Sequence, residues 1–270
     1  MDAYDYCKKI SSPEFAGRLT GDEGYTMAAQ WAASKFKEWG LRPISREDGY
    51  LQAFPSPYTL VEEAEMTFLI PDSGGTGEAP FREIRLKLAD DYLPLLFTDS
   101  GDTTAGLVFA GWGISAPELG YDDYADVDPA GRFVLCIRGT PDKDNEAFEE
   151  YDQHRTRMKK ARERGALGII YIYDEPNGHP NGDWIEGFLP AMISEKIADS
   201  LFVGQGLTIQ QIKEGLLRSK SPHSFGLEAR IRCHVRSRHF PDGAGYNVVG
   251  FITGSDFRID GGLTAGLGVK

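Results

Sequence analysis

Apolar and polar residues follow two different periods along this chain, and the changes of period predict most of its elements. Strands are indicated where apolar residues run together or alternate with polar ones, at residues 64–70, 84–88, 107–113, 133–137, 167–173, 227–235 and 246–254. Residues 20–39 and 146–164 repeat apolar positions every three or four residues, which is typical of one helix face. The centre of the chain, residues 107–173, is therefore predicted to have the order strand, strand, helix, strand.

Capping residues mark the ends of the predicted helices. Thr20 and Glu23 fit a capping box at the start of the first helix, and Gly40 provides a left-handed stop at its end. Two short helices are predicted to begin at Ser194 and at Thr208, the second with a glutamine three residues later that completes a capping box. The apolar face of the first helix consists of Tyr25, Ala28, Ala29, Ala32, Phe36 and Trp39. This helix must bury its aromatic residues against another element.

Three segments show no helical or strand period. Residues 50–58 form a short extended piece closed by two prolines, which is a natural place for a domain boundary. Residues 71–80 are rich in glycine and are predicted to form an exposed turn. Residues 261–270 are also rich in glycine and have no clear period.

Composition and charge describe an ordinary globular protein and exclude some partners. The chain has 270 residues, of which 41% are hydrophobic, and this is enough to build a core. The net charge of −12 argues against binding to nucleic acid, which requires clustered basic residues. No window approaches the roughly 18 apolar residues that indicate a membrane span. The basic residues of the helix at 146–164 are predicted to form its solvated face: Arg155, Arg157, Lys159, Lys160, Arg162 and Arg164.

The start of the chain and its cysteines bear on the compartment. Residues 1–7 have neither a basic flank nor an apolar core, so they are not a signal peptide, and either the protein is cytoplasmic or a leader has been removed. The three cysteines are Cys7, Cys136 and Cys233, and the last two fall among apolar residues of predicted strands. Cys136 and Cys233 are therefore predicted to be buried free thiols, and not parts of a disulfide or a metal site.

The five histidines lack the short spacings that zinc ligands use. His154 falls on the apolar face of its predicted helix, where a hydrogen-bonded core histidine is the better interpretation. His234 and His239 are separated by Arg236 and Arg238, and such a cationic neighbourhood disfavours a metal ion. The remaining two, His179 and His223, have no partner nearby in sequence.

The acidic turn at residues 122–128 raises a calcium hypothesis, because calcium prefers several carboxylates on one loop. Its spacing is not that of a helix-loop-helix calcium site, and Asp128 precedes a Pro-Ala-Gly turn that gives it a structural role. The alternative, a purely structural turn, is therefore favoured. No serine sits in a Gly-x-Ser-x-Gly elbow, and Cys136 lies within a predicted strand. The residues alone thus indicate no self-sufficient active site.

Several short stretches occur in the order found in a known enzyme family. Residues 15–21 (FAGRLTG), 36–43 (FKEWGLRP) and 50–54 (YLQAF) resemble the amino-terminal segment of zinc-dependent aminopeptidases. These are the exopeptidases related to aminopeptidase Y, glutamate carboxypeptidase and the transferrin receptor ectodomain.

Later stretches resemble two further parts of the same family. Residues 108–113 (VFAGWG), 121–128 (YDDYADVD) and the helix end at 159–166 resemble its inserted protease-associated domain. Residues 247–255 (NVVGFITGS) resemble the first strand of the peptidase sheet, to which the chain returns after the insertion. The likeness covers most of residues 10–256.

The resemblance implies a division into three parts. Residues 1–57 would be the amino-terminal helical segment of a peptidase-type domain, and residues 58–243 the protease-associated domain. Residues 244–270 would be a return strand of the peptidase-type domain with a glycine-rich end. The implied fold is α/β to α+β, with a β-rich inserted domain and flanking helices between one helix and one strand of an incomplete peptidase domain.

The metal ligands of that family lie beyond the matched stretches. The resemblance places a histidine and a zinc-bridging aspartate on the next strand, and this chain stops first. It therefore implies no catalytic, cofactor-binding or metal-binding residue here, and zinc is expected only in the absent peptidase core. The compartment stays open, since the family is often secreted or periplasmic.

Three functional hypotheses follow. The first is a non-catalytic accessory portion of a zinc aminopeptidase-like protein that caps the substrate cleft or mediates an interaction. The second is a free-standing module that binds a peptide or protein in an apolar groove. The third is one part of an active metallo-aminopeptidase completed by another chain. Apolar surface near residues 25–39 and 246–254 is expected either to pair internally or to bind another chain, including a second copy.

Overall fold

The computed structural model describes residues 2–15, 17–72, 81–176, 182–252, 255–259 and 265–268. These form two compact units. Unit 1 combines Met1–Tyr58 with His239–Lys270, and unit 2 is Thr59–Arg238. The unit boundaries thus fall at 58/59 and 238/239, where the sequence placed domain boundaries at 57/58 and 243/244. Most of the turn expected at 71–80, and His179, lie outside the described residues.

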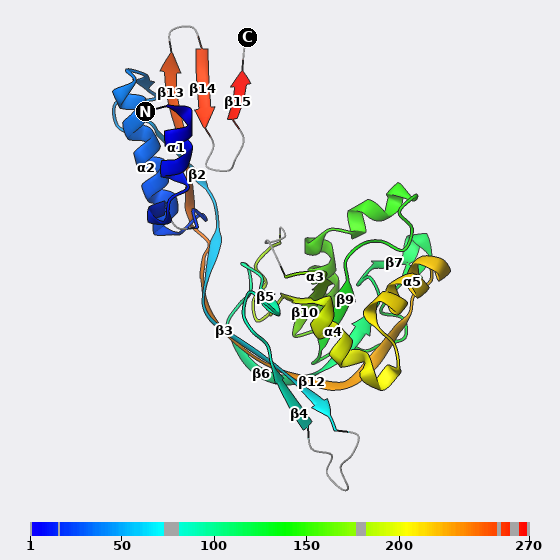
Figure 1. Cartoon of the computed structure of the whole chain (residues 1–270). Helices are drawn as coiled ribbons and strands as arrows, with labels where there is room; N and C mark the ends of the chain where they lie inside the picture. Colours follow the sequence, from blue (N-terminus) through cyan, green and yellow to red (C-terminus); the bar gives the residue numbers. More distant parts are fainter. Residues whose placement is uncertain are drawn as a thin grey trace. The chain divides into compact units, whose positions relative to one another are not determined.

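Unit 2 is built on an eight-stranded mixed sheet with the order β4-β3-β12-β6-β9-β10-β11-β5 (Figure 1). Its strands are β3 (Tyr58–Pro71), β4 (Phe81–Arg85), β5 (Tyr92–Pro94), β6 (Gly101–Ala110), β9 (Phe133–Ile137), β10 (Gly168–Tyr173), β11 (Ala191–Ser194) and β12 (Ser224–Phe240). Neighbouring strands from β6 to β11 are parallel, whereas β12 runs antiparallel to β6 and β5 antiparallel to β11. A separate two-stranded ladder joins β7 (Ser115–Ala116) to β8 (Tyr121–Asp122).

Helices cover both faces of the parallel strands. On one face, Met158 and Ala161 of α3 (His154–Glu163) share a buried cluster with Val134. On the other, α4 (Glu195–Phe202) and α5 (Ile209–Ser219) share a cluster with Leu135. Because side chains alternate along a strand, β9 contributes to both clusters, and all its residues are therefore apolar. Unit 2 is therefore a three-layer α/β arrangement, which agrees with the predicted mixed class.

The helix predicted over residues 146–164 is two elements in the structure. A 3₁₀ helix, η3 (Glu146–Tyr151), is capped by Asn145, and α3 begins only at His154. The break falls at Asp152, whose carbonyl oxygen and carboxylate both accept hydrogen bonds from Arg157 one turn into α3. The apolar period continues across the break, which is why the sequence suggests one helix. The shorter 3₁₀ helices elsewhere are η1 (Pro13–Phe15), η2 (Pro117–Leu119) and η4 (Val203–Gln205).

Unit 1 has a five-stranded antiparallel sheet around β13 (Ala244–Ile252). The other strands are β1 (Arg42–Pro43), β2 (Leu51–Pro55), β14 (Ser255–Ile259) and β15 (Ala265–Gly268). Both β1 and β2 pair with β13, β14 pairs along its other edge, and β15 pairs with β14. The glycine-rich end was expected to lack a period, but part of it forms β15 because a neighbouring strand offers an unpaired edge.

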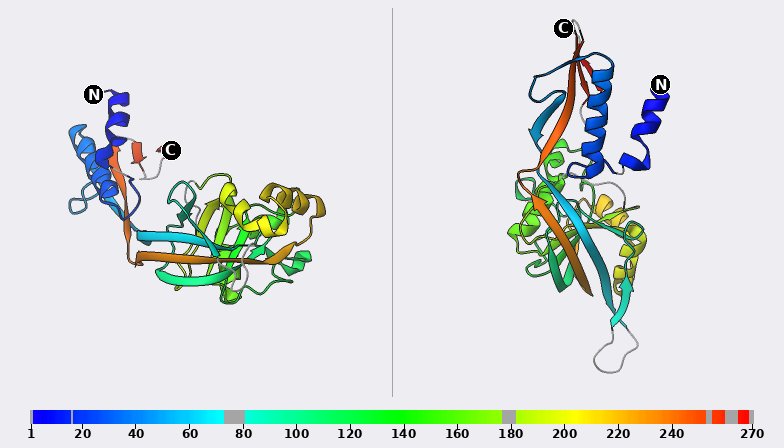
Figure 2. Two further views of the ribbon diagram at one scale, coloured as in Figure 1. Left: turned by 60° about the horizontal axis from the view of Figure 1, so that its bottom comes forward. Right: turned by 90° about the vertical axis from the view of Figure 1, so that its left-hand side faces the viewer.

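Helix α2 (Glu23–Glu38) packs on this sheet. Its Ala29 and Phe36 form a buried cluster with Val248 of β13. The apolar surfaces expected near residues 25–39 and 246–254 therefore pair with each other. A further helix, α1 (Ala3–Ile10), lies beside α2 (Figure 2), where the Tyr6 ring contacts those of Trp31 and Trp39. The sequence analysis did not predict α1.

The capping predictions have mixed outcomes. The box at Thr20 and Glu23 is wrong, because α2 takes Asp22 as its N-cap and no side chain accepts a hydrogen bond there. The left-handed stop at Gly40 is confirmed by its φ of +74°. The Ser194 hydroxyl accepts the Ile197 N–H at the start of α4, as predicted. The box at the start of α5, formed by Thr208 and its glutamine partner, is also confirmed.

The remaining sequence predictions concern thiols and membrane spans. Cys136 and Cys233 are buried free thiols, as predicted, and Cys7 is exposed. Among the described helices, none is both long and apolar enough to cross a membrane.

Candidate functional site

A buried polar network surrounds the loop that follows β6 in unit 2. One oxygen of the Asp123 carboxylate accepts the N–H groups of Trp112 and Ile114, both at 3.0 Å, and the other accepts the Tyr121 hydroxyl at 2.9 Å. Gly111, with φ +40°, is required here, since a Cβ at this position would lie 2.3 Å from an Asp123 oxygen. The carboxylate thus holds the loop in a conformation that the glycine makes accessible.

Arg157 holds the same loop from the other side. Its Nε donates to the Trp112 carbonyl at 2.7 Å, and its Nη2 donates to the Gly139 carbonyl at 2.6 Å and to the Asp152 carboxylate at 2.8 Å. The side chain is only 1% exposed. The prediction that Arg157 belongs to a solvated face is therefore wrong, because residues 154, 157, 158 and 161 share the inward face of α3. That spacing is the sequence feature that could have revealed it.

Burial shifts the pKa values of two groups near this loop in opposite directions. Burial raises the pKa of Asp123 to about 7, against the opposing effect of its hydrogen bonds and of the Arg157 charge. Burial lowers the pKa of His154 to about 4, and the charges of Arg138 and Arg157 act in the same direction. His154 is a buried histidine within 3.0 Å of the Tyr173 hydroxyl, as expected of a core histidine. The contacts of Asp123 and His154 are therefore those of buried residues that hold the fold together.

Two other acidic residues of the turn at 122–128 make local structural contacts. Asp122 accepts the Tyr124 N–H and lies 3.5 Å from Arg164, while Asp128 accepts the Ala130 N–H. These two carboxylates therefore cap backbone groups, which suits the structural interpretation that the sequence favoured over calcium.

His234 has a different neighbourhood from the one expected. Its ring nitrogens lie 3.5 Å from Asp102 and 3.7 Å from Glu63 on the adjacent strands. Arg236 is paired with Glu62 and Glu63. The expected cationic neighbourhood thus also contains carboxylates from the adjacent strands, which the sequence spacing does not show.

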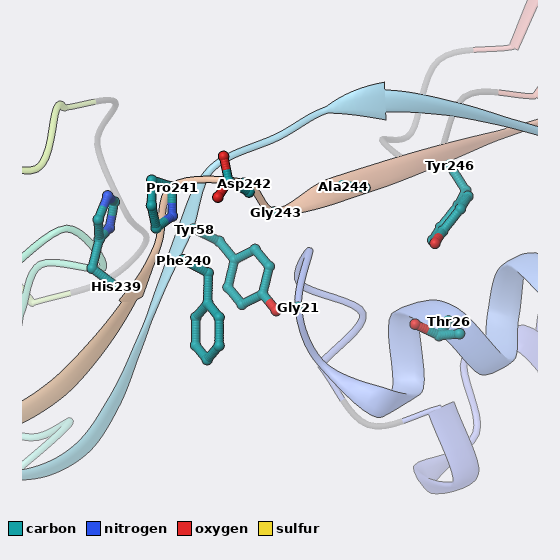
Figure 3. A pocket seen from close by; sticks show the side chains of 10 residues that line it. All are labelled: Gly21, Thr26, Tyr58, His239, Phe240, Pro241, Asp242, Gly243, Ala244 and Tyr246. Carbon is teal, nitrogen blue, oxygen red and sulfur yellow. The ribbon is translucent and has the colours of Figure 1, made fainter.

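A pocket of about 420 Å³ lies in unit 1, beside the turn that joins β12 to β13 (Figure 3). The Tyr58 ring forms one wall and stacks on Phe240, with the ring centroids 4.7 Å apart. Gly21 has φ +97°, and a Cβ there would lie 2.2 Å from the Tyr58 ring, while one on Gly243 would lie 2.6 Å from it. Both glycines are thus needed for the close approach of the backbone to this ring.

The opposite side of this pocket is set by α2 and β13. The Tyr25 hydroxyl donates to the Tyr246 carbonyl at 3.1 Å and accepts the Tyr246 N–H at 2.7 Å. These two hydrogen bonds of the Tyr25 hydroxyl join α2 to β13 next to Tyr246, whose side chain lines the pocket. No site residue was predicted here from the sequence, because Gly21, Tyr58 and Gly243 come together only through tertiary structure.

A groove of about 550 Å³ in unit 2 is acidic. Its lining includes Glu118, Glu146, Glu149 and Glu150 beside Leu119 and Tyr151. This groove differs from the apolar groove that a peptide-binding module was expected to carry.

Comparisons with known proteins give matches in structure. No family model matches the sequence, and no curated protein matches it. The aminopeptidase from Aneurinibacillus sp. strain AM-1 superposes with a TM-score of 0.51 and 17% identity over 92% of this chain and 47% of its own. A peptidase M28 precursor from Shewanella amazonensis SB2B gives a TM-score of 0.57 and 16% identity over 92% and 49%. BSAP, a zinc aminopeptidase from Bacillus subtilis, gives 0.51 and 16% over 92% and 45%.

What this chain shares with these proteins is the fold. Its structural neighbours are zinc aminopeptidases and an M28 peptidase, and the chain spans about half the length of each.

The described residues do not fit a zinc centre. Among them, no three or more His, Cys, Asp or Glu side chains are grouped so as to hold a metal ion. His234 lies 3.5 Å from Asp102 and 3.7 Å from Glu63. Glu63 is also paired with the Arg236 guanidinium, so a metal ion would have to compete with this cation for the carboxylate.

Proposed function

We propose that this chain is a non-catalytic accessory portion of a zinc aminopeptidase-like protein. In this proposal, unit 2 is a protease-associated-type domain that caps a substrate cleft or mediates a protein interaction. Unit 1 contributes a helix and strands to a peptidase-type domain. Zinc and the catalytic groups would lie outside the matched half of the fold.

The main support is the extent of the structural match. The match takes in 92% of this chain but only 45–49% of the neighbours, so the chain corresponds to a part of their fold. The order of the units along the chain adds support, since unit 2 lies between two segments of unit 1. No described residue is given a role in metal binding or catalysis.

Exposed apolar side chains in unit 1 favour a second candidate, in which another chain completes an active metallo-aminopeptidase. Trp39 and Tyr4 are 52% and 75% exposed, and Leu19, Phe54 and Ile252 are also exposed. Large exposed apolar side chains suit an interface with another chain.

The direct test is to measure the zinc content of the purified chain and its hydrolysis of leucine p-nitroanilide, with and without a chelator. The proposal predicts neither stoichiometric zinc nor turnover that a chelator abolishes. The variant His234→Ala is the matched control for zinc held adventitiously near Asp102 and Glu63. Stoichiometric zinc together with chelator-sensitive turnover would contradict the proposal. Turnover that arises only on adding a second protein would support the second candidate.

A further inference from the structure

Three hydroxyl groups face the pocket of unit 1 without a hydrogen-bond partner among the described residues. They belong to Thr26 on α2, Tyr58 at the start of β3 and Tyr246 on β13. All three side chains keep some exposure to solvent, so a ligand can reach them. In Figure 3 the Thr26 and Tyr246 hydroxyls point toward the side on which Tyr58 lies.

The lining of the pocket also contains aromatic rings beside these hydroxyls. Tyr58 is held by its stacking on Phe240 and by the close backbones of Gly21 and Gly243. Tyr246 is held by the hydrogen bonds of its backbone to Tyr25. The Tyr58 ring is therefore held before any ligand arrives, and a preorganised group loses little entropy on binding. Its volume of about 420 Å³ lies within the range of roughly 300–1,000 Å³ that is usual for small-molecule sites.

The charges of the lining select the class of ligand. No lysine or arginine lines the pocket, and its ionisable groups besides the tyrosines are Asp242 and His239. An anionic ligand would face the Asp242 carboxylate with no lysine or arginine beside it, and burying an unpaired charge is costly. A neutral ligand does not meet this penalty.

We propose that this pocket binds a neutral molecule rich in hydroxyl groups, of the size and chemistry of a monosaccharide. A pyranose has an apolar face of C–H groups, which suits the tyrosine rings, and an edge of hydroxyls. Each protein hydroxyl rotates and can both donate and accept, so three of them can match the edge of a sugar without bringing a charge into the site. This site is independent of the aminopeptidase-like proposal, which assigns no ligand to unit 1.

The test follows amide chemical shifts of the full chain by NMR during titration with methyl α-D-glucopyranoside. Shift changes are expected to be confined to residues around 21–26, 56–58 and 241–246. Thr26→Val and Tyr246→Phe each remove one hydroxyl and keep the shape of the side chain. Each is expected to weaken binding roughly three- to tenfold, the effect of one net hydrogen bond.

Controls separate the proposal from general solvation and from unfolding. Tyr4→Phe removes a hydroxyl from an exposed tyrosine outside the pocket and should leave the affinity unchanged. Inorganic phosphate and N-acetylalanine amide test the anionic and peptide-like alternatives. The proposal is overturned if the glucoside gives no localised shifts, or if either comparison probe binds the pocket as tightly. It is also overturned if Thr26→Val and Tyr246→Phe, with native melting temperatures, both bind as well as the unmodified chain.

Discussion

Units 1 and 2 bury their sheets in different ways. In unit 2, α3 covers one face of the parallel strands and α4 with α5 covers the other, so that β9 is completely buried. In unit 1, the buried members described for the cluster between α2 and the sheet are Ala29, Phe36 and Val248. Stability in small units depends on buried apolar area, so unit 2 should hold its fold far more strongly than unit 1.

The two units also differ in how they treat polar groups. Unit 2 buries Asp123 and Arg157 in a satisfied network, which stabilises one conformation of its central loop. Large apolar side chains are exposed in both units, for example Trp39 in unit 1 and Leu88 in unit 2. The contrast between the units therefore lies in the two-sided core and the buried polar network of unit 2.

The largest expected effect is on the network of unit 2. Arg157→Ala should lower the free energy of unfolding of unit 2 by about 3–5 kcal/mol, because it leaves buried acceptors without a donor. Arg155→Ala, on the same helix but with an exposed side chain, should change it by less than about 0.5 kcal/mol. Urea unfolding monitored by circular dichroism measures both. Equal effects of the two variants would contradict the assigned role of Arg157.

The next effect is a dependence of stability on pH through Asp123. Its pKa is raised from 3.8 to about 7 on folding, so its stabilising contribution is complete below about pH 4 and is lost as the pH rises to about 7. The loss is on the order of 4 kcal/mol. His154, whose pKa is lowered to about 4, acts oppositely by losing stability as the pH falls from about 6.5.

The contribution of Asp123 is isolated by comparison with Asp123→Asn. The asparagine keeps one oxygen for the two N–H groups and can place its NH₂ group against the Tyr121 oxygen. Urea midpoints at several pH values should show the unmodified chain losing stability relative to this variant between about pH 4 and 7. A constant difference across that range would show that burial does not raise the pKa of Asp123.

A smaller and local effect is expected in unit 1. Phe36 is 2% exposed in the α2 cluster, so Phe36→Ala should destabilise unit 1 by about 3 kcal/mol. Amide exchange in β9 and β10 should be unaffected, because these strands belong to the other unit. Faster exchange throughout both units would show that they unfold together.

A still smaller effect on stability is expected at Trp39. Because this side chain is 52% exposed but its ring contacts that of Tyr6, Trp39→Ser should lower the free energy of unfolding of unit 1 by about 1 kcal/mol, less than Phe36→Ala. It should nevertheless reduce any self-association of the chain, measured by sedimentation velocity. Self-association that persists unchanged in the variant would remove Trp39 from the interface.

The elements that could be predicted from the sequence are those whose buried residues form a run or a regular period along the chain. The runs at 133–137 and 167–173 correspond to β9 and β10, since parallel strands covered on both faces are apolar throughout. The alternation at 227–235 corresponds to β12, which buries one face. Helix ends were predicted where a side chain caps its own helix, as at Thr208.

Features that depend on distant contacts were missed. Arg157 looked like a surface residue because its carbonyl acceptors at Trp112 and Gly139 come from other segments. The same arginine explains the break between η3 and α3, which no local period records. Strand β15 has little apolar character of its own and depends on the edge of β14. The pocket of unit 1 likewise arises only when three separate segments meet.

Hydrogen exchange of the full chain across a urea series tests the contrast between the units most directly. The account predicts that amides of β13 and α2 lose protection at lower urea concentrations than those of β9 and β10, with the two groups separated by several kcal/mol in opening free energy. One shared transition, with equal opening free energies in both units, would contradict the view that unit 2 is the more stable of the two.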